Sequence, residues 1–334
     1  MNILIIGGSG FIGYNVCEFL LSKNLKKLTI VDNLSGQSSK KNFAKIKEKK
    51  FFNFYNINSS NYKKISSLIK KNKPDAILAL HGQVAVTKSI EDPRKDFNNN
   101  FLSIFNILES IRKYSPKSKL INLSSNKVYG KILNLKLKEE KLRYETSLLI
   151  NEKFPLSFES PYSCSKGAAD QYLLDYSKIY NLNTSSLRLS CVYGENQWGT
   201  EDQGWIAWFI KCAIKNKKIR IFGNGKQVRD ILHVKDLSNL IYIMLKQKKF
   251  PKGEAFNIGG GRKNTISLLE VVKKLELKFN KNINLSFLKP RFGDQKYFVN
   301  DLTKIKKLTG WSPKIDINKG LSLFVNWIIN NNND

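Results

Sequence analysis

Short apolar runs alternate with amphipathic segments over the first 125 residues of the chain. The apolar runs have the length of buried strands, and the segments between them repeat their apolar residues at helical spacing. The predicted strands are Asn2–Gly7, Lys27–Asp32, Phe51–Ile57, Asp75–Leu80 and Ser118–Ser125. Strands that alternate with helices form right-handed crossovers, so the pattern predicts an α/β fold with a doubly wound parallel sheet.

The pattern changes after residue 130. Residues 131–160 show no clear periodicity and are predicted to form a long loop, which in a compact domain is usually functional. A helix is expected from about Pro161, and a strand over Asn183–Ser190. Ser267–Glu270 has the pattern of a capping box that opens a helix, and Gly310–Lys314 predicts a turn before a last short helix. The C-terminal third has shorter elements, which indicates a smaller lobe over the sheet.

Composition excludes several classes of protein. Of the 334 residues 41% are hydrophobic, but no stretch approaches the roughly 20 apolar residues of a membrane span. The N-terminus lacks the basic start and long apolar core of a signal peptide. We therefore expect a cytoplasmic protein without integral membrane association. The four cysteines form no C-x-x-C pair and there are only two histidines, so no metal site is predicted and the thiols are expected to be reduced.

The net charge of +30 raises the question of nucleic-acid binding. Only eight of the 57 basic residues are arginine, although phosphate-binding surfaces tend to use arginine forks as well as lysine. The lysines are scattered through nearly every helical segment, and no element combines a basic stripe with interleaved aromatic residues. The charge therefore indicates a solvated lysine surface, with attraction to an anionic substrate or lipid headgroup as the alternative.

A glycine-rich turn follows the first predicted strand and opens the first helix. Gly7, Gly10 and Gly13 are spaced G-x-x-G-x-x-G, and glycines there let the backbone approach a pyrophosphate whose charge rests on the helix N-terminus. Asp32 ends the second strand, where an acid is expected to bind the ribose hydroxyls of an adenosine. Its charge would repel a 2′-phosphate, and Asn33 offers no compensating arginine. The pattern favours NAD over NADP.

Tyr162 and Lys166 are four residues apart in the first turns of a predicted helix, and so lie on one helical face. Ser124 and Ser125 end a strand that should point into the same cleft. A serine hydroxyl can hold a substrate oxygen, while a nearby ammonium, together with the cationic nicotinamide, lowers the pKa of a tyrosine so that phenolate can act as a base. Lys166 would also bind the nicotinamide ribose.

Together these motifs resemble the extended short-chain dehydrogenase/reductases, specifically the NAD-dependent nucleotide-sugar epimerases and dehydratases. The resemblance covers essentially the whole chain and includes the segments Gly223–Asp236 and Arg291–Asp301. It implies catalytic roles for Ser125, Tyr162 and Lys166, and a homo-oligomer in which the segment Asn98–Tyr114 is a plausible packing helix. Cofactor contacts are implied for Gly7, Gly10, Phe11, Ile12, Gly13, Asp32, Asn33, Ser35, Asn56, Ile57, Leu80, Asn100, Tyr162 and Lys166. Substrate contacts are implied for Gln83, Ser125, Asn126, Arg229 and Arg291.

The resemblance also implies how the chain is divided. Residues 1–182 would form a Rossmann-type NAD-binding domain onto which residues 230–255 pack back. Residues 183–229 and 256–334 would form a smaller C-terminal α/β lobe that binds the substrate, a nucleotide-diphosphate sugar. Arg229 and Arg291 stand where the family carries arginines for the diphosphate, and bidentate contacts would suit them.

Four segments narrow the resemblance to epimerases that invert C2 of a CDP-linked sugar for surface-polysaccharide (O-antigen) synthesis: His81–Pro93, Ser124–Gly130, Ser160–Tyr176 and Asp202–Phe209. Dehydratases of the family carry an Asp-Glu pair after the catalytic Ser or Thr, because water elimination needs an acid and a base. Asn126 and Lys127 occupy these positions here, so dehydration is disfavoured. The alternatives are a UDP-sugar 4-epimerase that uses the same catalytic residues, and an NAD-sensing or interaction protein without catalysis.

Some positions depart from the family pattern. Asn56 replaces the usual acid after the third strand, and Cys191 replaces a substrate-contacting Asn of related epimerases. His81 stands two positions later than the family's histidine; it either perturbs the cofactor contact or simply packs. His233 is expected to cap or pack rather than react. Trp198, Trp205 and Trp208 could stack on a base or sugar, although aromatic residues near helical spacing usually belong to a core.

Overall fold

The computed structural model describes residues 1–23, 27–48, 52–133 and 135–331. Its largest element is a parallel sheet of seven strands in the order β12-β8-β5-β4-β1-β2-β3. The strands are β1 (Asn2–Ile6), β2 (Lys27–Asp32), β3 (Phe52–Asn56), β4 (Ala76–Ala79), β5 (Lys119–Ser125), β8 (Asn183–Leu189) and β12 (Glu254–Ile258). Phe51, at the start of the predicted third strand, lies outside the described residues, as do Asn134 in the predicted loop and residues 332–334 of the predicted lobe.

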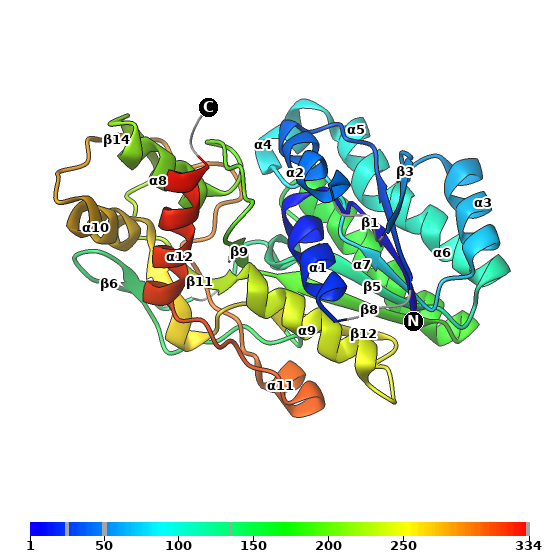
Figure 1. The fold of residues 1–334 in the computed structure, drawn as a ribbon. Coiled ribbons are helices and arrows are strands. Elements are labelled where there is room, and N and C mark those ends of the chain that lie inside the picture. Colours follow the sequence, from blue (N-terminus) through cyan, green and yellow to red (C-terminus); the bar gives the residue numbers. More distant parts are fainter. Residues whose placement is uncertain (24–26, 49–51, 134, 332–334) are drawn as a thin grey trace.

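Helices cover both faces of this sheet, as predicted (Figure 1). The face that packs on α1 (Phe11–Leu21) and α9 (Val234–Lys246) includes Ile3 and Ile5, whereas Leu4 and Ile6 point to the opposite face. Successive side chains of a strand alternate between faces, and a sheet covered on both sides needs apolar residues at every position. This is why the run in β1 is continuously hydrophobic.

Two further groups of helices complete the layers. The opposite face is covered by α3 (Tyr62–Asn72), α6 (Ser103–Tyr114) and α7 (Pro161–Tyr180), and α2 (Gln37–Lys47) and α11 (Thr303–Thr309) contribute buried residues on the side of α1. The segment before α6 consists of α4 (Val86–Glu91), α5 (Pro93–Phe97) and one π-helical turn, η1 (Asn98–Leu102). The prediction of a Rossmann-type α/β fold is confirmed.

A smaller lobe lies beside the sheet (Figure 1) and has its own hydrophobic core. Its helices are α8 (Trp205–Ile214), α10 (Leu268–Phe279), α12 (Ile317–Asn330) and the short turn η3 (Arg262–Asn264). Its strands are β9 (Cys191–Tyr193), β10 (Ile219–Phe222), β11 (Val228–His233), β13 (Thr265–Ser267), β14 (Leu285–Leu288) and β15 (Tyr297–Phe298). β10 pairs with β14, and β11 pairs with β9, β13 and β15. The predicted capping box is present, since Ser267 accepts the N–H of Glu270 at the start of α10.

The predicted boundaries between the two parts need correction. β8 begins at Asn183 and β12 ends at Ile258, and both strands belong to the seven-stranded sheet although residues 183–189 and 256–258 were assigned to the lobe. β8 pairs with β5 and β12 pairs with β8, and both strands are almost fully buried, so they are parts of the sheet and not of the lobe. The chain enters the lobe at β9, and α9 packs on α1. The last helix, α12, is also longer than predicted.

Among its described residues, the loop predicted over 131–160 contains only the two-residue strands β6 (Lys138–Glu139) and β7 (Tyr144–Glu145), after the 3-10 turn η2 (Asn126–Tyr129). Within the described ranges, no helix has the length and apolar content that crossing a membrane requires. The same residues contain no group of three or more His, Cys, Asp or Glu side chains that could hold a metal ion.

Candidate active site

The carboxyl ends of five parallel strands meet at one edge of the sheet. Gly7 follows β1, Asp32 ends β2, Asn56 ends β3, Leu80 follows β4 and Ser125 ends β5. The strand order reverses between β1 and β4, and ligands of open α/β sheets bind beyond the strand ends at such a switch point. The topology therefore places the predicted cofactor and catalytic residues along one crevice.

The helix that carries Tyr162 and Lys166 starts at a well-defined cap. Ser160 accepts the N–H of Ser163 at 3.2 Å, and Pro161 occupies the first helical position, where its missing N–H costs nothing. Because Tyr162 is the next residue, its orientation depends on where the cap starts the helix. Tyr162 and Lys166 are both almost completely buried on the same side of α7, 6% and 4% exposed.

Tyr162 lies against Ser125. The Ser125 hydroxyl acts on the Tyr162 phenol across the junction between α7 and the end of β5. Burial raises the pKa of the Tyr162 phenol to about 12; the Ser125 hydroxyl lowers it, and the nearby Asp96 carboxylate raises it. Lys166 is not among the groups that shift this pKa in the protein alone, because its ammonium is directed to the main chain of β5; the lowering predicted for the site with bound cofactor stays a prediction.

Lys166 Nζ donates a hydrogen bond of 3.0 Å to the main-chain oxygen of Leu123, two residues before Ser125 on the same strand. Burial lowers the pKa of Lys166 to about 8, with Asp96 acting in the opposite direction. The three predicted catalytic groups are thus gathered at the end of β5. The Lys166 ammonium bonds Leu123 and not the Tyr162 phenol.

Asp96 is a buried carboxylate that the sequence analysis missed. Its Oδ1 accepts a bond of 2.9 Å from Asn100 Nδ2, which also donates to the main-chain oxygen of Gln83 at 3.0 Å. Asn100 lies in the π-helical turn η1. Gly82 packs against both Asn100 and Lys166, since a Cβ placed on Gly82 would lie 2.5 Å from Asn100 Oδ1 and 2.8 Å from Lys166 Nζ. A signal was available: Asp96 precedes Asn100 by four residues, one helical turn.

The glycine turn has the shape that a dinucleotide requires. Gly7 has φ +82°, a left-handed conformation that favours glycine. A Cβ on Gly13 would lie only 2.0 Å from the Gly7 carbonyl oxygen, so the first turn of α1 can pack this closely only without a side chain. The turn therefore leaves bare backbone at a helix N-terminus, which suits a pyrophosphate.

Asp32 is oriented by the same turn. Its Oδ2 accepts the N–H of Ser9 at 3.0 Å, and its Oδ1 accepts the N–H of Leu34 at 2.9 Å. Burial raises the pKa of Asp32, although the backbone N–H groups act against that rise. A carboxylate held in this way at the end of β2 fits the ribose hydroxyls of the adenosine, and the residues present fit NAD.

The other predicted cofactor contacts surround this turn. Phe11 and Ile12 open α1, and Ser35 N–H bonds the side chain of Asn33 at 3.1 Å. Asn56 and Ile57 follow at the exposed end of β3, and Leu80 continues the pairing of β4, its N–H bonded to the oxygen of Ile6 at 2.9 Å. The structure brings these residues to one edge of the sheet; their contacts with NAD remain predictions.

His81 behaves as a packed histidine. Its Nε2 lies 2.7 Å from the hydroxyl of Ser103. Burial, with a smaller contribution from Lys166, lowers its pKa to about 3, so the ring is neutral. His81 also crowds the glycine turn, since a Cβ on Gly7 would lie 2.6 Å from its Cα.

The predicted substrate residues fall into two groups. Gln83 and Asn126 stand near the catalytic end of β5, where Gln83 Nε2 bonds the oxygen of Ala85 at 2.6 Å. Arg229 and Arg291 belong to the lobe: Arg229 pairs with Asp294 at 2.7 Å, and Arg291 pairs with Asp202 at 3.1 Å while it lies over the Phe222 ring. Asp294, which orients Arg229, was also missed from the sequence.

Cys191 lies at the start of β9, where the lobe meets the sheet. Burial raises the pKa of its thiol, and the neighbouring Trp205 lowers it. Trp205 and Trp208 pack against the core of the lobe. Trp198 donates to Asn42 Oδ1 at 2.9 Å and lies edge-on to Trp327. All three tryptophans of the stacking hypothesis are only partly buried, and stacking on a base or sugar stays a prediction.

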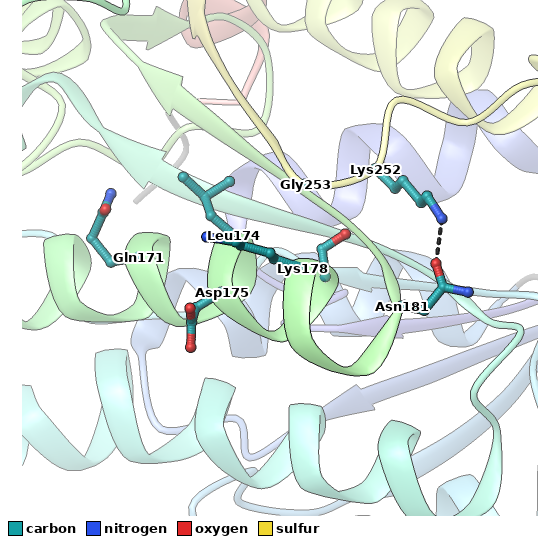
Figure 2. A pocket seen from close by; sticks show the side chains of 8 residues that line it. Gln171, Leu174, Asp175, Lys178, Asn181, Lys252 and Gly253 are labelled. Atoms are coloured by element: carbon teal, nitrogen blue, oxygen red, sulfur yellow. Dashed lines mark hydrogen bonds between the residues drawn. The ribbon is translucent and has the colours of Figure 1, made fainter.

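His233 is the N-cap of α9, where its Nδ1 accepts the N–H of Lys235 at 3.4 Å, and its Nε2 lies 3.2 Å from Glu195. The prediction that His233 caps or packs is confirmed. A hollow of about 590 Å³ follows the outer side of α7 (Figure 2), where Lys252 donates to Asn181 Oδ1. None of the predicted site residues lines this hollow, so it is not the candidate active site.

The fold and this site together define the class of protein. The chain belongs to the NAD dependent epimerase/dehydratase family, which residues 3–259 match. The predicted family and the predicted NAD dependence are therefore confirmed.

Particular relatives narrow this class. The chain is 41% identical over 335 residues to the CDP-paratose 2-epimerase of Salmonella typhi, covering 98% of this chain and 99% of that protein. It is 31% identical over 329 residues to the UDP-glucuronate 4-epimerase of Thermodesulfobacterium geofontis, covering 97% and 95%. The structure of UDP-glucuronic acid 4-epimerase from Bacillus cereus, in complex with UDP-glucuronic acid and NAD, matches with a TM-score of 0.87 at 26% identity and covers 99% of both chains.

Proposed function

We propose that this chain is an NAD-dependent isomerase that inverts C2 of CDP-paratose to give CDP-tyvelose, in the synthesis of a surface-polysaccharide (O-antigen) precursor. The observation that carries the proposal is the burial of the Tyr162 phenol beside the Ser125 hydroxyl, in a chain that is 41% identical to a CDP-paratose 2-epimerase. A phenol beside a serine hydroxyl at a strand end can exchange a proton with a sugar hydroxyl held between them.

The glycine turn and Asp32 would hold NAD, which would supply reversible hydride chemistry at the sugar carbon; recovery of the hydride on the opposite face would invert that carbon, so no external reductant is needed. Ser125 would hold the C2 oxygen, and Tyr162 would take its proton and give it back. Because the pKa of Tyr162 is about 12, this transfer needs positive charge nearby. Lys166, buried on the same side of α7, would supply part of it and bind the nicotinamide ribose.

Arg229 and Arg291 would bind the diphosphate of the substrate. Both are arginines of the lobe with carboxylates that fix their orientation, Asp294 and Asp202. Guanidinium groups bind phosphate through paired N–H donors, which fixes the orientation of the ligand as well as its position. We also propose that Gln83 and Asn126 contact the sugar, since both follow strands that end at the catalytic edge.

The competing reaction is inversion at C4 of a UDP-sugar by the same catalytic residues, which the similarity to UDP-glucuronate 4-epimerase supports. Dehydration is disfavoured because Asn126 and Lys127 follow Ser125, and neither supplies carboxylate acid–base chemistry. A protein that only senses NAD would have no need for a phenol and a hydroxyl in contact.

A single assay distinguishes these functions. Purified protein is given CDP-paratose or UDP-galactose, and the products are followed by NMR. Inversion at C2 of CDP-paratose is expected; inversion of the UDP-sugar at C4 instead would select the alternative. If the protein retains NAD and converts neither sugar, the non-catalytic function is selected.

We further propose a cytoplasmic homo-oligomer. Cysteines without disulfide bonds are typical of a reducing compartment, and all four are free. Large apolar side chains are exposed along α5 and α7, namely Phe97, Tyr172, Ile179 and Tyr180 at 41–61%. Such side chains in one region mark contact surfaces. Light scattering after size-exclusion chromatography tests the oligomer, and a monomeric mass at micromolar concentration would contradict it.

A further inference from the structure

The turn that follows the catalytic Ser125 is tied to a loop more than 160 residues further along the chain. Lys127 Nζ donates to the main-chain oxygen of Gly293 at 2.8 Å and lies 3.4 Å from Asp294 Oδ1. Asn126 Nδ2 donates to Gln295 Oε1 at 3.0 Å, and Gln295 Nε2 donates to the oxygen of Gly130 at 2.6 Å. The end of β5 therefore holds residues 293–295 through three side chains.

The same loop reaches the arginines proposed for the diphosphate. Asp294 Oδ1 accepts a bond of 2.7 Å from Arg229, whose side chain is only 7% exposed. Asp294 Oδ2 accepts a bond of 3.3 Å from Gln227. Arg291 belongs to the loop itself. A single carboxylate thus links Lys127, beside Ser125, to Arg229 in β11.

The charges around Asp294 do not cancel. Burial alone would raise the pKa of Asp294, but Arg229 and Lys127 hold it below its ordinary value, so the carboxylate is ionised. Lys127, with 21% of its side chain exposed, and Arg229 share this one counter-ion. Two cations on one carboxylate leave a net positive charge at a partly buried site, which favours an anionic ligand beside it.

We infer that Lys127 is a positioning residue for the substrate. It holds the loop Arg291–Gln295 against the end of β5, so that the diphosphate reaches Arg229 and Arg291 while the sugar reaches Ser125 and Tyr162. The inference rests on the proposed function for the substrate class, a nucleotide-diphosphate sugar, and for the roles of the two arginines and of Ser125 and Tyr162. Lys127 is not a catalytic residue, because its ammonium is bound to Gly293 and Asp294 on the side of the lobe.

The matched variants are Lys127→Met, Lys127→Arg and, as a control, Lys131→Met, which removes an exposed lysine four residues further on. Removing a contact that positions the substrate weakens ground state and transition state alike, so KM should rise with little change in kcat. We expect Lys127→Met to raise KM for the sugar about tenfold, which corresponds to about 1.4 kcal/mol, and to change kcat less than about threefold. Lys127→Arg should restore most of the affinity, and Lys131→Met should resemble the wild type.

Two measurements keep this test independent of turnover. Calorimetry with CDP and with UDP should show weaker binding to Lys127→Met for whichever nucleotide the wild type binds. Hydrogen exchange should be faster over residues 291–296 in Lys127→Met than in Lys131→Met. An unchanged KM, or exchange equal to that of the control, would overturn the inference. A wild type that binds neither nucleotide would instead overturn the proposed function, and the exchange rates alone would then decide whether Lys127 holds the loop.

Discussion

Lys166 and Leu123 are joined by a hydrogen bond of 3.0 Å from the lysine ammonium to a main-chain oxygen of β5. This bond fixes α7 against the strand that ends in Ser125, and it keeps a charged group in a place from which water is excluded. Burial of an ammonium disfavours its charged form, which is why the pKa of Lys166 falls to about 8. Burying the charged Lys166 therefore lowers the free energy of unfolding of the protein.

Lys166→Met should therefore stabilise the NAD-free protein at neutral pH while it abolishes turnover. The pKa of Lys166 is about 8 in the folded protein, whereas an unperturbed lysine in the unfolded chain has a pKa of 10.5. Between these values the unfolded chain binds more protons, so the stability of the wild type rises with pH through this window. At pH 7 the cost is present in full, and we expect a gain of about 1–3 kcal/mol in the free energy of unfolding.

Urea denaturation at pH 7 and at pH 10 measures this gain, which should shrink at the higher pH. Lys178→Met, at an exposed position of the same helix, is the control and should show neither effect. A Lys166→Met variant that is less stable than the wild type at pH 7 would show that the bond to Leu123 outweighs the buried charge.

Tyr162→Phe removes the proton-transfer group and leaves the rest of the crevice in place. We expect bound NAD to remain, because the glycine turn and Asp32 do not depend on the phenol. Turnover should fall by about 10²–10⁴, the usual contribution of a positioned acid–base group. NAD released on denaturation and the NMR assay measure the two quantities. Undiminished turnover would refute the role of Tyr162.

Gly13→Ala should weaken the binding of NAD. The added Cβ would lie 2.0 Å from the Gly7 carbonyl oxygen, so the glycine turn must move. Overpacking of this kind costs about 1–3 kcal/mol, which for a cofactor site is an affinity loss of about fivefold to 150-fold. Gly36→Ala, whose Cβ would meet only Ser39 Oγ at 3.4 Å, is the control. Equal NAD content in the two purified variants would contradict the prediction that the glycine turn binds NAD.

Asp170→Ala should lower the stability of the protein, because Asp170 anchors α7 to the sheet. Asp170, within α7, forms a fully buried ion pair of 2.6 Å with Arg188 of β8. Removal of one partner leaves the other charge buried and unpaired, which costs about 3–5 kcal/mol. Thermal denaturation should show a large loss for Asp170→Ala and a change below about 0.5 kcal/mol for the exposed Asp175→Ala. Similar melting temperatures would show that Arg188 finds another partner.

Much of the fold could be predicted because it depends on local pattern. The four residues Ile3–Ile6 of β1 are all apolar, so a strand covered on both faces was evident from the sequence. The glycines at 7, 10 and 13 and the acid at 32 each satisfy a local backbone requirement. The boundary at residue 182 was placed wrongly because membership of a sheet depends on pairing: β8 joins β5, and β12 joins β8.

Some contacts of the site could be predicted from the sequence, whereas others depend on the tertiary structure. Sequence spacing alone places Tyr162 and Lys166 on one helical face, since a helix repeats every 3.6 residues. Only the tertiary structure decided that Tyr162 meets Ser125, that the Lys166 ammonium bonds Leu123 instead of the phenol, and that Asp294 links Lys127 to Arg229. These partners lie between 37 and 167 residues apart in the chain and are chosen by packing and charge balance in three dimensions, which no local pattern encodes.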